Sequence, residues 1–163
     1  MRTYLIIFII TILTACSESV KPVDLGVENQ ILYIGNGTEP QDLDPHIVTG
    51  VPESKVLMAL LEGLVIRNPD GPEPLPGVAK DWDISSDGKT YTFYLRDNAL
   101  WSNGDYVTAY DFVYAWNRVL MPSLGSKYPD MLYDVINAEE FNKGIIKDFS
   151  RVGVKALDSK TLK

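Results

Sequence analysis

The sequence predicts a mixed fold of helices and strands (α/β, mixed α+β), and three observations support this prediction. Apolar and polar residues alternate on both sides of Asp87-Gly88 within residues 82–96, which is the pattern of a β-hairpin. Apolar residues recur every three to four positions over residues 54–63 and 108–120, which is the spacing of amphipathic helices. With 163 residues and 45% hydrophobic composition, the chain is long and apolar enough for one domain with a buried core.

The N-terminus has the pattern of a lipoprotein signal peptide over residues 1–16. A positive Met-Arg start precedes the apolar run TYLIIFIITILTA, which is shorter than the roughly 20 residues that a membrane-spanning helix needs. Leu-Thr-Ala then leads to Cys16, the only cysteine, so no internal disulfide can form. We predict an exported protein with a lipid anchor at Cys16, in the periplasm or on the outer face of the cell membrane. The alternative is a cleaved signal whose cysteine is incidental. Residues 17–30 are polar without clear periodicity, which predicts a flexible tether.

The folded part is expected to begin at residue 31. The β-prone run over residues 31–34 ends at Gly-Asn-Gly and predicts a strand followed by a turn. The next segment contains Pro40, Pro45 and Pro52, which exclude a regular helix and favour an extended path. A helix follows, with Ser54 as its expected N-cap and Gly63 near its end. The Pro/Gly-rich residues 67–77 predict a surface loop.

The second half is expected to continue with two helices and a β-hairpin. Thr108 and Asp111 have the spacing of a capping box, which predicts where the helix over 108–120 begins. A further helix is expected over residues 130–142, and alternation over residues 151–157 predicts a strand that returns at residues 161–162. Because the last arm is too short to bury a face, we expect the sequence to be the N-terminal part of a longer protein.

The charged residues and motifs exclude several classes of function. There are 15 Lys and Arg against 22 Asp and Glu, which argues against a nucleic-acid partner. The stretch QDLDPHIVTGVPES contains His46, the only histidine, close to Asp42 and Asp44. A metal site usually needs three or four ligands, so these side chains are expected to fix the loop through nearby backbone groups. The sequence has no nucleophile elbow and no phosphate-binding loop, and we predict no catalytic residue, no metal and no cofactor.

One aromatic residue differs from the others in its context. Most aromatic residues between positions 82 and 116 have the spacing of a strand or of a helix face, and are expected in the core. Tyr128 lies in SLGSKYPD, a loop between helices, where an aromatic ring packs in the core or makes a contact with a ligand. The pattern leaves both roles open.

Several motifs together resemble one family. The stretch GVAKDWDISSDGKTYTFYLRDNALWSNGDYVTAYDFVYAWNRV contains D-G-x-x-Y-x-F-x-L-R, then W-S-x-G, then V-T-A-x-D-F-V-Y-A-W. These motifs resemble the bacterial extracellular solute-binding proteins of family 5, which serve ABC importers for oligopeptides, dipeptides or nickel. The segment LDPHIVTGVPES is most similar to the oligopeptide-binding branch. The resemblance extends from about residue 31 to the end.

The resemblance implies a type II periplasmic-binding-protein clamp, of which residues 31–163 would hold the start of one lobe and most of the small accessory domain. It also implies that Thr49, Gly50 and Val51 form an extended strand that pairs with the ligand backbone, and that Tyr128 lines the cleft. Thr49 stands where the oligopeptide type often carries an acid. The groups that bind the termini of a peptide would lie outside this chain, so we expect no tight peptide binding by the chain alone.

The function implied by the resemblance is oligopeptide binding for import by a monomeric lipoprotein that meets ABC permease subunits. Dipeptide, heme, nickel chelate and sugar remain open as ligands. The alternative is a peptide-sensing or adhesion lipoprotein on the same fold, which is not coupled to import. The sequence offers no means of separating these two functions.

Overall fold

The computed structural model describes residues 21–163, in one unit that ends at Gly37 and a second that spans Thr38–Lys163. The predicted signal peptide, the lipidation site Cys16 and the first part of the predicted tether lie outside the described residues. Over residues 21–163, none of the helices combines the length and the apolar character that a membrane crossing requires.

In the described part of the first unit, residues 21–37, the chain forms one short helix, α2 (Pro22–Asn29). We expected an irregular segment here; the helix forms because Pro22 presets the first turn and Gln30 ends it in a left-handed conformation, φ +57°. The strand expected over residues 31–34 is absent from the described structure, and that prediction was wrong. Strand backbone needs a paired neighbour, and this exposed run has no strand partner within residues 21–163.

The second unit is built on an antiparallel sheet in the order β3-β4-β5, formed by β3 (Ala79–Ile84), β4 (Tyr91–Leu95) and β5 (Thr161–Leu162). The predicted hairpin is confirmed as β3 and β4, and its turn contains Gly88 at φ +71°, a conformation that favours glycine. A separate two-stranded pair, β1 (Val65–Ile66) and β2 (Leu75–Pro76), closes the base of the Pro/Gly-rich loop.

Helix α4 (Ala109–Leu120) confirms the helix predicted over residues 108–120. The backbone N–H and the hydroxyl of Thr108 donate to Asp111 Oδ2 at 2.7 and 2.8 Å, so the expected capping box is present. Met121 ends the helix, and the 3₁₀ turn η1 (Pro122–Leu124) follows. The apolar face of α4 packs on the core as predicted.

Helix α3 (Val51–Leu60) begins earlier than the sequence suggested. Its N-cap is Gly50 and not Ser54, because Pro52 fits the first turn, where a missing N–H has no effect on helical bonding. Val51 therefore belongs to α3, and the strand expected over residues 49–51 is wrong at Val51. The helix ends three residues before Gly63, so that glycine does not cap it.

The single helix expected over residues 130–142 is wrong. The segment contains the 3₁₀ turn η2 (Pro129–Leu132) and the short helix α5 (Ala138–Asn142). Asn137 separates them at φ +61°, and its Nδ2 donates to the Arg151 carbonyl at 2.6 Å, which holds this break in place. A local hydrogen bond thus overrides the helical spacing.

The strand expected over residues 151–157 is wrong in its first part, where Arg151 belongs to the 3₁₀ turn η3 (Phe149–Arg151), whereas Ala156 in its second part forms an isolated antiparallel bridge with Leu162. The return strand over 161–162 is confirmed as β5, which pairs with β4. Backbone groups of Lys155 and Lys163 exchange two hydrogen bonds of 2.8 Å, so the chain does fold back here as a narrow hairpin.

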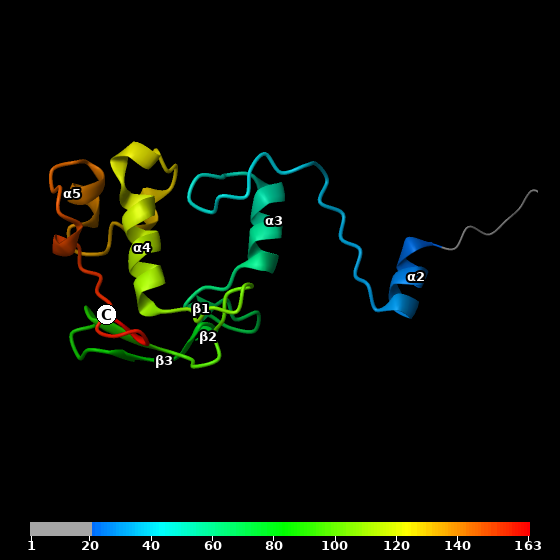
Figure 1. Ribbon diagram of the computed structural model, residues 1–163, viewed down its shortest axis with the longest axis horizontal. Helices are drawn as coiled ribbons and strands as arrows, with labels where there is room; N and C mark the ends of the chain where they lie inside the picture. Colours follow the sequence, from blue (N-terminus) through cyan, green and yellow to red (C-terminus); the bar gives the residue numbers. More distant parts are fainter. Residues whose placement is uncertain (1–20) are drawn as a thin grey trace, which may run out of the picture. The chain divides into compact units, whose positions relative to one another are not determined.

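The core lies between the sheet and the helices α4 and α5, which stand on the same side of the strands in Figure 1. Its fully buried large side chains come from β4, α4, the segment after η3, and β5; they are Leu95, Leu120, Val152 and Leu162. The segment before α3 runs outside this core, and its polar side chains form the site described next.

Candidate ligand-binding site

The loop that precedes α3 is held by the carboxylates of two aspartates. Asp42 Oδ1 accepts the N–H groups of Leu43 and Asp44 at 2.6 and 2.9 Å, and Asp44 Oδ1 accepts that of His46 at 3.0 Å. These are side-chain turns of the kind that Asp favours, because its short carboxylate reaches the backbone two residues later. The expectation that these side chains fix the loop is confirmed for the two aspartates.

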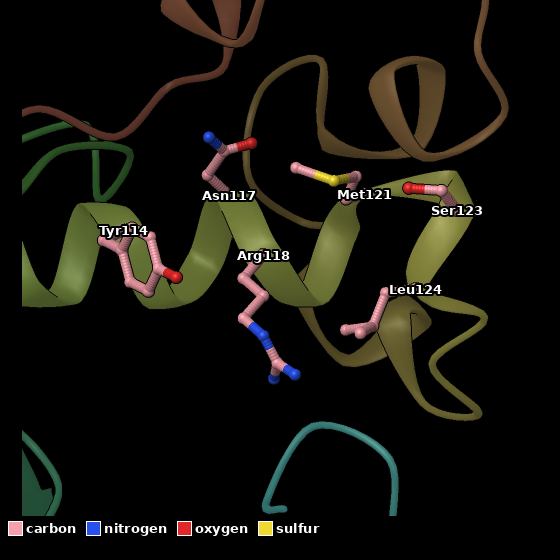
Figure 2. Close-up of a pocket in the computed structure, with 6 residues that line it drawn as sticks. All are labelled: Tyr114, Asn117, Arg118, Met121, Ser123 and Leu124. Atoms are coloured by element: carbon pink, nitrogen blue, oxygen red, sulfur yellow. The ribbon is translucent and has the colours of Figure 1, made fainter.

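A residue that the sequence analysis missed connects this loop to α4. Arg118 donates from Nη1 to Asp44 Oδ1 at 2.9 Å and from Nη2 to Asp44 Oδ2 at 2.5 Å, and its Nη1 also lies 2.8 Å from His46 Nδ1. Figure 2 shows the guanidinium extending away from α4 toward the neighbouring loop. Because Asp44 and Arg118 are 74 residues apart, no local spacing in the sequence indicates the pair.

The contact with Arg118 lowers the pKa of both Asp44 and His46. The hydrogen bonds from Arg118 lower the pKa of Asp44 from 3.8 to about 2, against an opposing effect of burial. Burial, together with the positive charge of Arg118, lowers the pKa of His46 below its ordinary 6.5. Since the guanidinium only donates, Nδ1 of His46 acts as acceptor, which fixes the neutral tautomer with its proton on Nε2. His46 is thus a neutral brace in the folded protein.

We expect His46 to titrate below pH 6.5 and to do so nearer to 6.5 in Arg118→Leu, because that variant removes a like charge. The only histidine gives a single imidazole signal, so proton NMR measures the pKa directly. Arg67→Leu, on an exposed arginine, serves as control and should leave the value unchanged. Since the unfolded chain takes up the proton first, stability should fall as the pH drops through 6.5. A wild-type pKa at or above 6.5 would contradict this geometry.

Two of the four predicted ligand-binding residues line a common cavity of about 390 Å³ in front of α3. Thr49 and Gly50 form part of its wall, and the residues that line it are Thr38, Glu39, Gln41, Asp42, Ile47, Val48, Thr49, Gly50, Pro52 and Glu53. Val51 is outside this lining and is 69% exposed as the first residue of α3. Gly50 has extended backbone, φ −84° and ψ 155°, so the approach to the helix keeps part of the expected extended path.

Glu53, which the sequence analysis did not single out, is the buried charged residue of this wall, with 4% of its surface exposed. Its Oε1 accepts the Gln41 N–H at 2.7 Å. A Cβ atom on Gly50 would overlap Oε2 of this carboxylate, so only glycine leaves room for it. The signal in the sequence was the position of Glu53, two residues after the first residue of α3. It could be recognised only once Gly50 was known to be the N-cap of that helix.

A second cavity of about 300 Å³ lies along the end of α4. Figure 2 shows the six side chains that line it: Tyr114, Asn117, Arg118, Met121, Ser123 and Leu124. Tyr128 is not among them; it precedes η2 and is 53% exposed, so it is not a core residue. The structure therefore does not bring Tyr128 into a cavity with Thr49 and Gly50. Within residues 21–163, no three His, Cys, Asp or Glu side chains gather closely enough to hold a metal ion.

Comparison with known proteins identifies the family. Residues 73–163 match the model of the bacterial extracellular solute-binding proteins, family 5 Middle. The periplasmic oligopeptide-binding protein OppA of Haemophilus influenzae is 46% identical over 136 residues, which are 82% of this chain and 25% of that protein. The chain thus spans about a quarter of the length of such curated relatives.

Solved structures agree with this match. The crystal structure of H. influenzae OppA in complex with RPPGFSPFR has a TM-score of 0.72 at 46% identity, covering 78% of this chain and 25% of that one. The pheromone receptor PrgZ, solved for its mode of peptide binding, has a TM-score of 0.72 at 35% identity, with coverage of 77% and 25%. The fold is of the periplasmic-binding-protein type, as expected, and the chain belongs to the bacterial extracellular solute-binding proteins of family 5, in their oligopeptide-binding branch.

Proposed function

We propose that the protein binds oligopeptides outside the cytoplasm and delivers them to the permease subunits of an ABC importer. It acts as a monomer held at the membrane by a lipid on Cys16, and it binds its ligand without chemical change. The family match and the identity to periplasmic oligopeptide-binding proteins support peptide binding and export. The lipid anchor is supported by the Leu-Thr-Ala-Cys pattern alone.

One observation carries the proposal: over 78% of its length, this chain is 46% identical, at a TM-score of 0.72, to a protein solved in complex with RPPGFSPFR. The cavity beside Thr49 and Gly50 is consistent with that use. A peptide that lies extended pairs through its main chain, and water-filled pockets tolerate varied side chains. Val51 is the first residue of α3, so the helix offers no acceptor for its backbone N–H. In the proposed complex this N–H donates to a carbonyl of the ligand.

Val51→Pro tests this assignment in the complete protein. Proline is favoured at the first helical position, and the extended Gly50 suits a following proline, so the fold should tolerate the change. We expect RPPGFSPFR to bind wild type with micromolar or tighter affinity by isothermal titration calorimetry, and Val51→Pro to weaken it about tenfold through the loss of one backbone donor. Val51→Ala keeps the N–H and serves as control. Equal affinities of wild type and Val51→Pro would show that Val51 does not pair with ligand, and no binding by wild type would contradict the function itself.

The similarity to the pheromone receptor PrgZ favours a second candidate, a lipoprotein that captures peptides for sensing and is not coupled to import. Uptake of a labelled peptide by intact cells separates the two. Import predicts that removing the protein abolishes uptake. Sensing predicts unchanged uptake and a lost response to the peptide.

A further inference from the structure

The loop over residues 40–50 ends in the segment that is expected to contact the peptide, and it is tied at two points. At its base, a backbone N–H donates to the buried carboxylate of Glu53 at 2.7 Å. At its turn, Arg118 donates to both carboxylate oxygens of Asp44, at 2.9 and 2.5 Å. In the described part of the chain, no other residue outside the loop and α3 is hydrogen-bonded to the loop. Arg118 is therefore the hydrogen-bonding residue that fixes the loop relative to α4.

Asp44 connects Arg118 to the rest of the loop. Its carboxylate accepts the His46 N–H at 3.0 Å, and its carbonyl accepts the N–H groups of Ile47 and Val48 at 3.1 and 3.2 Å. Ile47 and Val48 both lie in the wall of the cavity in front of α3. Because the turn is bonded to Asp44, and Asp44 to Arg118, the loss of the arginine contact frees this part of the cavity wall to move.

His46 shares one nitrogen of the arginine with Asp44, since Arg118 Nη1 lies 2.9 Å from Asp44 Oδ1 and 2.8 Å from His46 Nδ1. Nδ1 accepts this bond only while it carries no proton; a protonated ring would set a second donor and a second positive charge against the guanidinium. Within residues 21–163, two charged groups act on His46: Arg118, which disfavours the proton, and Asp44, which favours it. Tyr114, one turn earlier on α4, is a further titratable group that acts on Arg118.

We propose that Arg118 positions the ligand-contacting segment, and that this positioning is lost when His46 takes up a proton. The inference rests on the proposed peptide-binding function and adds a dependence on pH to it. Neither residue lines the cavity beside Thr49 and Gly50, so both act through the loop. The loop binds peptide only while Arg118 holds it, so the apparent affinity falls with the fraction of molecules in which the contact is intact.

The direction of the pH dependence follows from the pKa of His46. Burial and the charge of Arg118 hold this pKa below its ordinary 6.5 while the contact is in place, and the pKa returns toward 6.5 once the ring is released. Affinity is therefore complete above pH 6.5 and falls as the pH drops through 6.5 toward the lower pKa. Asp44 stays ionised throughout this range, because its pKa is about 2.

Isothermal titration calorimetry of the complete protein with RPPGFSPFR tests the proposal. We expect wild type to bind at least about threefold more weakly at pH 5 than at pH 7. His46→Asn is the matched variant, because its side-chain oxygen accepts a hydrogen bond as Nδ1 does and takes up no proton in this range. It should bind like wild type at pH 7 and equally well at both pH values. Any titration of the peptide itself is common to the two proteins.

The arginine is tested at pH 7, where the contact is intact in wild type. Arg118→Leu should weaken binding about tenfold and abolish the dependence on pH, because the released loop has no contact left to lose. Arg67→Leu removes an exposed arginine that lines neither cavity, and should change neither property. If Arg118→Leu does not fold, the comparison of wild type with His46→Asn still decides the matter.

A measurement without ligand separates the position of the loop from binding. Leu43 on the loop and Tyr110 on α4 are both exposed, so each can be replaced by a spin-labelled cysteine in a Cys16→Ser chain. Electron paramagnetic resonance then gives the distribution of distances between the two labels. We expect a narrow distribution at pH 7 and a broader one at pH 5. With His46→Asn added, the distribution should be narrow at both.

Equal affinity of wild type at pH 5 and pH 7 overturns the proposal and leaves the peptide-binding function standing. A loss of affinity at pH 5 that is the same in His46→Asn overturns it as well, since other groups would then be responsible. A distance distribution that stays narrow at pH 5 does so too, because the loop then keeps its position. If RPPGFSPFR binds at neither pH, the function itself fails, and the proposal fails with it even where the distances broaden.

Discussion

Leu95→Ala is expected to lower the free energy of unfolding by about 3 kcal/mol, the typical loss when a buried leucine is truncated and the core cannot close the gap. Leu95 is 1% exposed and ends β4, the central strand. It pairs with Ala79 on β3, and its N–H donates to the Lys160 carbonyl at 2.8 Å. Backbone hydrogen bonds therefore hold together the elements that enclose the Leu95 side chain. The cavity that truncation to alanine leaves should thus persist.

Urea denaturation of the chain, followed by circular dichroism, measures this loss. Leu60→Ala is the control, since Leu60 lies on α3 and is 68% exposed, where truncation should change stability by less than about 0.5 kcal/mol. Similar losses for both variants would mean that the side chains around Leu95 do not form a close-packed core.

Gly77→Ala is expected to destabilise the chain by about 2 kcal/mol, because an added methyl group forces backbone apart. A Cβ at this position would lie 2.6 Å from the Gly63 carbonyl oxygen and 3.1 Å from that of Leu64. Those two carbonyls accept hydrogen bonds from Val78 and from Gly77 itself at 2.9 and 3.2 Å. The carbonyls cannot retreat without breaking these bonds, and a rotamer change cannot relieve the clash.

Gly71→Ala is the matched control in the same loop. The nearest atom to its added Cβ would be Asn68 Nδ2 at 3.6 Å, an ordinary contact, and we expect stability equal to wild type or slightly higher. The comparison of the two variants by thermal denaturation separates the steric effect at position 77 from the general effect of replacing a loop glycine. A loss at Gly71 as large as that at Gly77 would refute the steric explanation.

The parts of the fold that the sequence predicted well depend on neighbouring residues. Asp87-Gly88 and the alternation around it suffice for a hairpin, and Thr108 with Asp111 suffices to start α4. The missed features depend on distant partners or on single backbone conformations. Asn137 breaks a regular helical pattern through its bond to Arg151, which no periodicity reveals.

The candidate site divides in the same way. Asp42 and Asp44 are turn formers by residue type, and their bracing role could be predicted from the sequence alone. The bond between Asp44 and Arg118 spans 74 positions, so it required the fold. The burial of Glu53 could not be predicted either, because the expected N-cap at Ser54 placed it outside the helix.

The central position of β4 has a consequence for the order in which the chain folds. Its first neighbour, β3, is adjacent in sequence, whereas its second, β5, is formed by residues 161–162. During synthesis from the N-terminus, the hairpin can therefore form early, but one edge of β4 stays unpaired until residues 161–162 have emerged from the ribosome. An open edge of this kind is a template for pairing with other chains. Nascent chains stalled before residue 161 should thus be the species most prone to aggregate, and those most in need of a chaperone.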